Sequence, residues 1–119
     1  MAHGGFLRQH SDDPELASHI MHDYTKANLD TETRGMLDFA TKLTREPSSM
    51  QERDVQGLRS LGLSDEQILS IVLIACVFNF MTRLADGLGV KVPPGRQEAA
   101  ERWLTGPVLE QEWLMTPKG

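Results

Sequence analysis

The chain has 119 residues, of which 39% are hydrophobic and 24% are charged. This balance predicts one globular domain over residues 1–119 and excludes a disordered or fibrous chain. The formal net charge of −5 disfavours nucleic acid as a partner. The single cysteine excludes an internal disulfide and a multi-thiolate zinc site. With no secretory signal visible at the start, we expect a cytoplasmic protein.

Two helices are expected in the first part of the chain. Asp12-Asp13-Pro14 favours a helix start, and apolar residues at spacings of three and four predict a helix over about 14–28. Asp30-Thr31 then opens a second helix, which ends before Pro47 because the residue before a proline avoids the helical conformation.

Three more helices are expected in the rest of the chain. The pattern Ser49-x-x-Glu52 is typical of a capping box and predicts a short third helix, which Gly62 closes in the left-handed conformation. Ser64 opens the longest helix, over about 65–87, and a last helix is expected over 96–104. No stretch alternates apolar and polar residues, so the predicted fold is all-α, with about five helices.

The long helix differs from the others because it is apolar on all sides. From Ile68 to Met81 only Ser70 and Asn79 are polar, and the unbroken apolar run is 8 residues. That run is far shorter than the ~18 residues that span a bilayer, so no membrane partner is expected. We expect a central helix covered by its own domain or by another subunit, hence a homo-oligomer with residues 68–84 at the interface. Cys76, within the run, is expected to be a small core residue.

Few residues offer chemistry of their own. His19 and His22 have a spacing that could hold part of a metal site, but no third ligand follows from the sequence. We therefore expect solvent-facing histidines, no bound metal and no cofactor. Asn79, Arg83 and Asp86 lie at the end of the long helix and are candidate ligand-binding residues, with Arg83 and Asp86 able to pair at a pocket edge.

Longer motifs cover about three quarters of the chain. They are His3-Gly4 with Leu7-Arg8, the run from Met36 to Pro47, Asp54-Val55 with Leu58-Arg59, the run from Gly62 to Leu69, and the run from Phe78 to Val90. In these segments the chain resembles the C-terminal part of the alkyl hydroperoxidase D-like (AhpD-like) proteins, the peroxidase-related branch of the carboxymuconolactone decarboxylase superfamily.

The resemblance implies an AhpD-like helical domain, usually oligomeric, in which a Cys-x-x-Cys pair reduces hydroperoxides with a thiol reductant. His3 matches the histidine that follows that pair, so the resemblance implies a catalytic role for it. Both family cysteines are absent, and the chain is expected to lack the family's N-terminal half. Either the start was placed late, or this is a short member that lost the redox site.

The functional expectation is therefore a peroxidase-related, antioxidant oxidoreductase, and whether this chain is itself an enzyme stays open. The alternative is a non-catalytic helical oligomeric scaffold or a small-molecule-binding protein. Decarboxylation, the other chemistry of the superfamily, ranks last because no acid-base set is visible.

Overall fold

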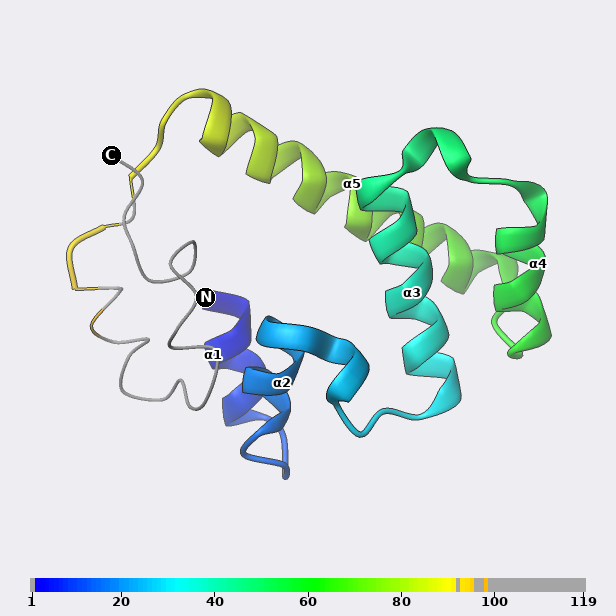
Figure 1. Cartoon of the computed structure of the whole chain (residues 1–119), viewed down its shortest axis with the longest axis horizontal. Coiled ribbons are helices and arrows are strands. Elements are labelled where there is room, and N and C mark those ends of the chain that lie inside the picture. The colour runs from blue at the N-terminus through cyan, green and yellow to red at the C-terminus, as the bar shows by residue number, and fades with distance from the viewer. Residues whose placement is uncertain (1, 92, 96–97, 99–119) are drawn as a thin grey trace. The chain divides into compact units, whose positions relative to one another are not determined.

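The computed structural model describes residues 2–91, 93–95 and 98. Within them the chain forms five α-helices and two short 3₁₀ helices and contains no strand (Figure 1), which confirms the all-α prediction. The elements in chain order are α1 (Ala2–Gln9), α2 (Leu16–Asp23), η1 (Tyr24–Lys26), α3 (Thr31–Arg45), η2 (Pro47–Ser49), α4 (Glu52–Ser60) and α5 (Asp65–Gly87).

The elements fall into two compact units. One comprises residues 29–88, with α3, η2, α4 and α5, and the other comprises residues 2–28 together with the described residues after 88. In the second unit α1 packs against α2, and α2 against η1. Its buried apolar residues are Ala17 and Ala27.

The core of the 29–88 unit lies where α3, α4 and α5 meet. Its buried apolar cluster consists of Phe39, Leu58, Leu63 and Ile68. Partly buried side chains surround this cluster: Met36, Leu43, Met50, Val55, Leu61, Ile71 and Val72. Helix α3 supplies Phe39 and α4 supplies Leu58 to the buried cluster, and Ile68 comes from the start of α5.

Local side-chain hydrogen bonds fix the helix starts that the sequence predicted correctly. Asp30 Oδ1 accepts from the Thr33 N–H at 2.7 Å at the start of α3. Ser64 Oγ accepts from the Gln67 N–H at 3.2 Å, while Gln67 Oε1 accepts from the Ser64 N–H at 2.8 Å, which completes the capping box of α5. Gly62 adopts φ +95° in the turn between α4 and α5, as predicted.

The predicted helix over 14–28 was too long. The chain forms α2 over Leu16–Asp23 and then the 3₁₀ turn η1. Asp23 explains the break, because its Oδ1 accepts from the Thr25 N–H at 3.1 Å and from the Thr25 hydroxyl at 2.6 Å. This local bonding competes with the helical ladder. Helix α1 was not predicted at all.

The predicted start of the third helix was also wrong. Ser49 belongs to η2, where its hydroxyl donates to the Glu46 carbonyl at 2.8 Å. The N-cap of α4 is Gln51, whose N–H donates to Asp54 Oδ2 at 2.7 Å. Of the helix predicted over 96–104 the structure describes only Glu98, which is helical, and Pro94 and Gly95 form a turn before it.

Candidate functional site

The four candidate site residues fall in different units. His3 lies on α1, with an exposed side chain, in the unit of residues 2–28. Asn79, Arg83 and Asp86 lie on the last turns of α5, in the 29–88 unit. No single unit therefore assembles all four residues into one site.

Within the 29–88 unit, Asn79 and Arg83 lie together. Asn79 Nδ2 donates to the Thr44 hydroxyl at 3.0 Å, which ties α5 to α3. Arg83 Nη1 donates to the main-chain carbonyl of Asn79 at 3.3 Å, one turn earlier in the same helix. Asp86 is exposed, and its ion pair with Arg83 stays a prediction. The bond from Asn79 to Thr44 joins two helices, so Asn79 contributes to packing within this unit.

The histidines in the unit of residues 2–28 do not gather around a common point. His10 stacks on Phe6 with ring centroids 4.1 Å apart, and its Nδ1 lies 2.8 Å from the Phe6 carbonyl oxygen. His19 is exposed and His22 half-buried on α2. Among the described residues no three His, Cys, Asp or Glu side chains form a cluster that could hold a metal ion.

Sequence reasoning missed an open groove of about 350 Å³ between α3 and α4. It is lined by Gly35, Asp38, Phe39, Lys42, Arg53, Asp54, Gly57, Leu58 and Leu61. A Cβ at Gly35 would collide with Cδ1 of Leu61, so the side chain of Leu61 fills the space beside this glycine. No motif in the sequence signals the groove.

An ion pair crosses the polar side of this groove. Lys42 Nζ donates to Asp54 Oδ1 at 2.7 Å and to Oδ2 at 2.8 Å. These bonds lower the pKa of Asp54 below its usual value, and the bond from the Gln51 N–H is the next largest cause of the lowering. At neutral pH Asp54 is therefore charged, and its ion pair with Lys42 joins α3 to α4.

The expectation that Cys76 is a core residue was wrong, because its side chain is exposed. The same holds for most of α5, whose only fully buried side chain is Ile68. Its last turns extend past α3 (Figure 1), beyond the bond from Asn79 to Thr44. The expected cover on every side is thus missing within this unit.

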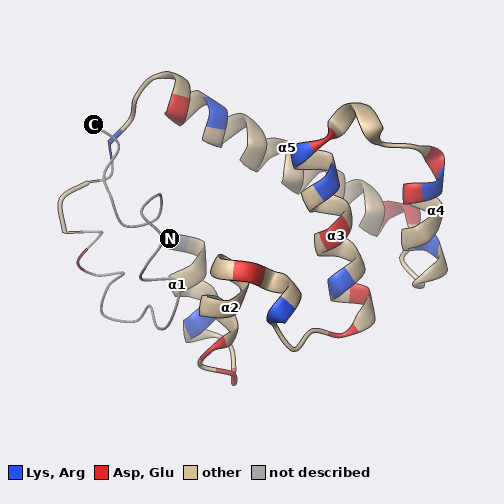
Figure 2. Cartoon of the chain, in the orientation of Figure 1, with Lys and Arg blue, Asp and Glu red and all other residues tan. Residues whose placement is uncertain are grey.

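The uncovered side of α5 is a continuous apolar surface. Eight large apolar side chains on this surface are each at least 45% exposed. These residues are Leu69, Leu73, Ile74, Val77, Phe78, Phe80, Met81 and Leu84. Figure 2 shows that charged residues occur only near the two ends of α5. An exposed apolar surface of this extent is a candidate interaction site.

By length and composition alone, α5 could also cross a membrane. The sequence-based exclusion counted only the unbroken apolar run of 8 residues and was too strict. Core helices of soluble proteins meet the same criterion, so length and composition do not decide between a lipid and a protein environment.

Two solved structures resemble this chain in sequence and in fold. An uncharacterized peroxidase-related protein from Silicibacter sp. TM1040 is 41% identical, with a TM-score of 0.69. An uncharacterized peroxidase-related protein from Ralstonia eutropha JMP134, an alkylhydroperoxidase AhpD core, is 34% identical, with a TM-score of 0.67. Each match covers 72% of this chain. No family model matches the sequence, and no curated protein gives a significant match.

Over the matched part, the chain belongs to the peroxidase-related, AhpD-like proteins, as the sequence motifs indicated. It spans 45% of the length of each of the two structures. The two structures therefore show the family and the fold of this chain, and they do not show its activity.

Proposed function

We propose that this protein acts in thiol-dependent hydroperoxide reduction, with these 119 residues supplying the helical framework and the surface for self-association. The observation that carries the proposal is the identity of 34 to 41% to two peroxidase-related proteins, one of them an AhpD core. A reducing cytoplasm, which keeps thiols reduced, suits this role.

The chemistry requires two thiols. A thiolate attacks one peroxide oxygen and breaks the O–O bond, which gives a sulfenic acid and an alcohol. A second thiol then condenses with the sulfenic acid to form a disulfide and water, and an external thiol reductant restores both groups. The chain has one cysteine, Cys76, on an apolar helix, so we assign it a framework role. His3 would act beside the thiol pair as a proton carrier, in keeping with its place in the family motif.

Self-association is the second part of the proposal. The exposed apolar side chains of α5 over residues 68–84 favour burial against another subunit. The groove between α3 and α4 and the lone cysteine favour the alternative function, a non-catalytic scaffold or small-molecule-binding protein.

The test combines mass and turnover. The intact mass of the endogenous protein is measured first, and its consumption of tert-butyl hydroperoxide with dithiothreitol is compared with that of the 119-residue chain and its Cys76→Ser variant. We expect turnover by the endogenous protein and no difference between the 119-residue chain and Cys76→Ser. With turnover, an endogenous mass above 13.3 kDa would place the thiol pair outside these 119 residues. An endogenous protein of 13.3 kDa without turnover would leave the scaffold as the function.

A further inference from the structure

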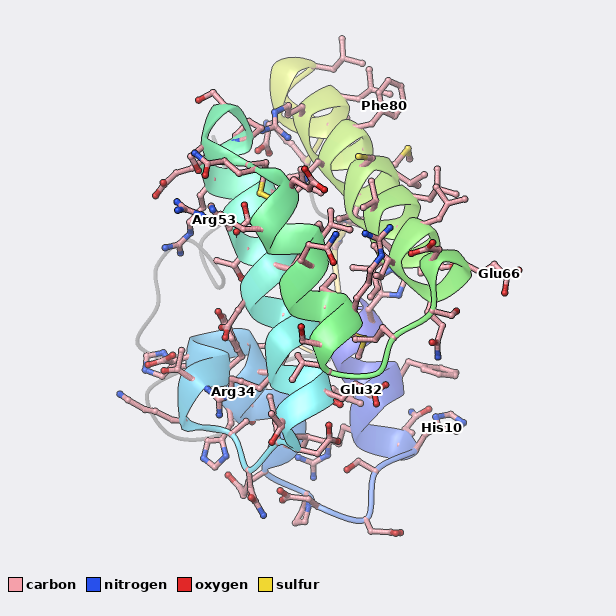
Figure 3. All side chains as sticks on the ribbon, turned by 90° about the vertical axis from the view of Figure 1, so that its right-hand side faces the viewer. His10, Glu32, Arg34, Arg53, Glu66 and Phe80 are labelled. Carbon is pink, nitrogen blue, oxygen red and sulfur yellow. The ribbon has the colours of Figure 1, made fainter. Side chains whose placement is uncertain are left out.

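One side of α5 carries a regular stripe of exposed residues. Its six positions are separated alternately by three and four residues, the spacing at which side chains line one seam of a helix. We call these positions the 66–83 stripe: Glu66, Leu69, Leu73, Cys76, Phe80 and Arg83. All six are exposed in this chain. Figure 3 shows Glu66 and Phe80 projecting from α5 on the side away from α3 and α4.

The stripe is complementary to itself when a second copy runs in the opposite direction. With the two helices centred between residues 74 and 75, Glu66 lies opposite Arg83 of the other copy. In the same register Leu69 lies opposite Phe80, and Leu73 lies opposite Cys76. Each apolar side chain thus meets an apolar one or the thiol, and each charge meets its opposite at both ends, over about 25 Å of helix.

A parallel pair lacks this complementarity. It would place Glu66 against Glu66 and Arg83 against Arg83, and like charges at equivalent positions repel. The charge pattern also disfavours a lipid surface, since Asp65 and Glu66 occupy the first turn of α5 and Arg83 is its one basic residue. Membrane-bound helices usually carry Lys or Arg at their ends or on their polar face.

We propose that two copies of this chain pair through antiparallel α5 helices along the 66–83 stripe, with Leu73 and Cys76 at the two-fold axis and Glu66 paired to Arg83 of the other copy at each end. The proposal deepens, and rests on, the self-association proposed above. It does not depend on the peroxidase chemistry.

The test is a charge exchange in the full 119-residue chain. Sedimentation equilibrium from ~1 to ~100 μM at low ionic strength measures the dimer dissociation constant, since salt screens exposed ion pairs. We expect Glu66→Arg and Arg83→Glu each to raise that constant roughly tenfold, because each change turns two attractions of the symmetric dimer into repulsions. The double variant Glu66→Arg with Arg83→Glu restores attraction at both ends and returns the constant to near its original value.

Matched controls separate pairing from folding. Glu52→Arg makes the same charge change on α4 and leaves the dimer intact. Leu73→Asp places two carboxylates at the axis and abolishes the dimer, whereas Leu88→Asp, at an exposed leucine outside the stripe, does not. Circular dichroism checks that each variant keeps its helical content.

Three results would overturn the proposal. A chain that stays monomeric at 100 μM and binds phosphatidylcholine vesicles has a lipid partner in place of a second copy. A chain that stays monomeric and does not bind vesicles has neither a lipid partner nor a second copy as its partner. Both results also refute the proposed self-association. A dimer unaffected by the charge exchange refutes only the antiparallel register. None of these results bears on hydroperoxide turnover by the endogenous protein.

Discussion

At the scale of single residues, the best-defined interaction is the ion pair between Lys42 and Asp54. Asp54 accepts two bonds from Lys42 Nζ and one from the Gln51 N–H, so one carboxylate both joins α3 to α4 and caps α4. Its side chain is 18% exposed and that of Lys42 is 31% exposed, which reduces screening by water.

This pair makes stability depend on pH. The pKa of Asp54 is lowered in the folded state, chiefly by Lys42, so its contribution is complete above the unfolded value of about 3.9 and is lost as pH falls through the folded value. We expect Asp54→Asn to lower the Tm by a few degrees at pH 7, with the difference from wild type shrinking below about pH 4. Thermal unfolding followed by circular dichroism measures it. Asp12→Asn, at an exposed site, is the control, and a difference constant with pH would contradict the expectation.

Prediction at the residue scale succeeded for motifs and failed for burial. The motifs quoted for the resemblance identified the family correctly, because such motifs can be recognised from the sequence without knowledge of the fold. Cys76 was misplaced because an apolar neighbourhood in sequence was taken for an apolar neighbourhood in space. The groove between α3 and α4 was missed because its lining residues come from two helices and are brought together only by packing.

At the scale of elements, the helix boundaries show when a sequence signal suffices. Asp30 and Ser64 each accept a backbone N–H three residues ahead, and both predicted starts were right. Asp23 and Ser49 carry the same kinds of polar side chain, but bond within a tight turn and interrupt the predicted pattern. The short polar side chains permit both outcomes, and only the surrounding packing decides between them.

The cap of α5 gives a direct test of this element. Ser64→Ala removes the acceptor for the Gln67 N–H, and we expect it to lower the free energy of unfolding by about 1 kcal/mol in urea denaturation. Ser48→Ala, at an exposed position of η2, should change it by less than about 0.5 kcal/mol. Equal effects of the two substitutions would show that the cap does not stabilise α5.

The packing of the elements is tested by two leucines. Leu58 on α4 is 2% exposed in the core, whereas Leu69 on α5 is 58% exposed. We expect Leu58→Ala to lower the free energy of unfolding by about 2 to 5 kcal/mol, because it leaves a cavity. Leu69→Ala should change it by less than about 0.5 kcal/mol when the chain is dilute enough to be monomeric. A comparable loss at both sites would mean that α5 is covered within the single chain.

At the scale of the whole molecule, the sequence predicted a long helix that needs cover but could not say what provides it. The bounds of α5 were predicted correctly, over residues 65–87, because its cap and its closing glycine are local. Its cover is not local: within the 29–88 unit α3 and α4 pack on one side and leave a broad apolar surface. The two peroxidase-related structures are matched over 45% of their length, so the similarity to them does not identify what covers α5.

Cys76 can report on that cover in the wild-type chain. Its thiol is exposed in a single copy and lies at the axis of the proposed pair, so association should shield it. We expect its reaction rate with a thiol-specific disulfide reagent to fall at least tenfold as the protein concentration rises through the dimer dissociation constant, because only the dissociated chain reacts readily. In Leu73→Asp, which cannot pair, the rate constant should stay at the fast value at every concentration. A wild-type rate constant independent of concentration, in a range where sedimentation finds dimers, would place Cys76 outside the interface and require a different face of α5 to form it.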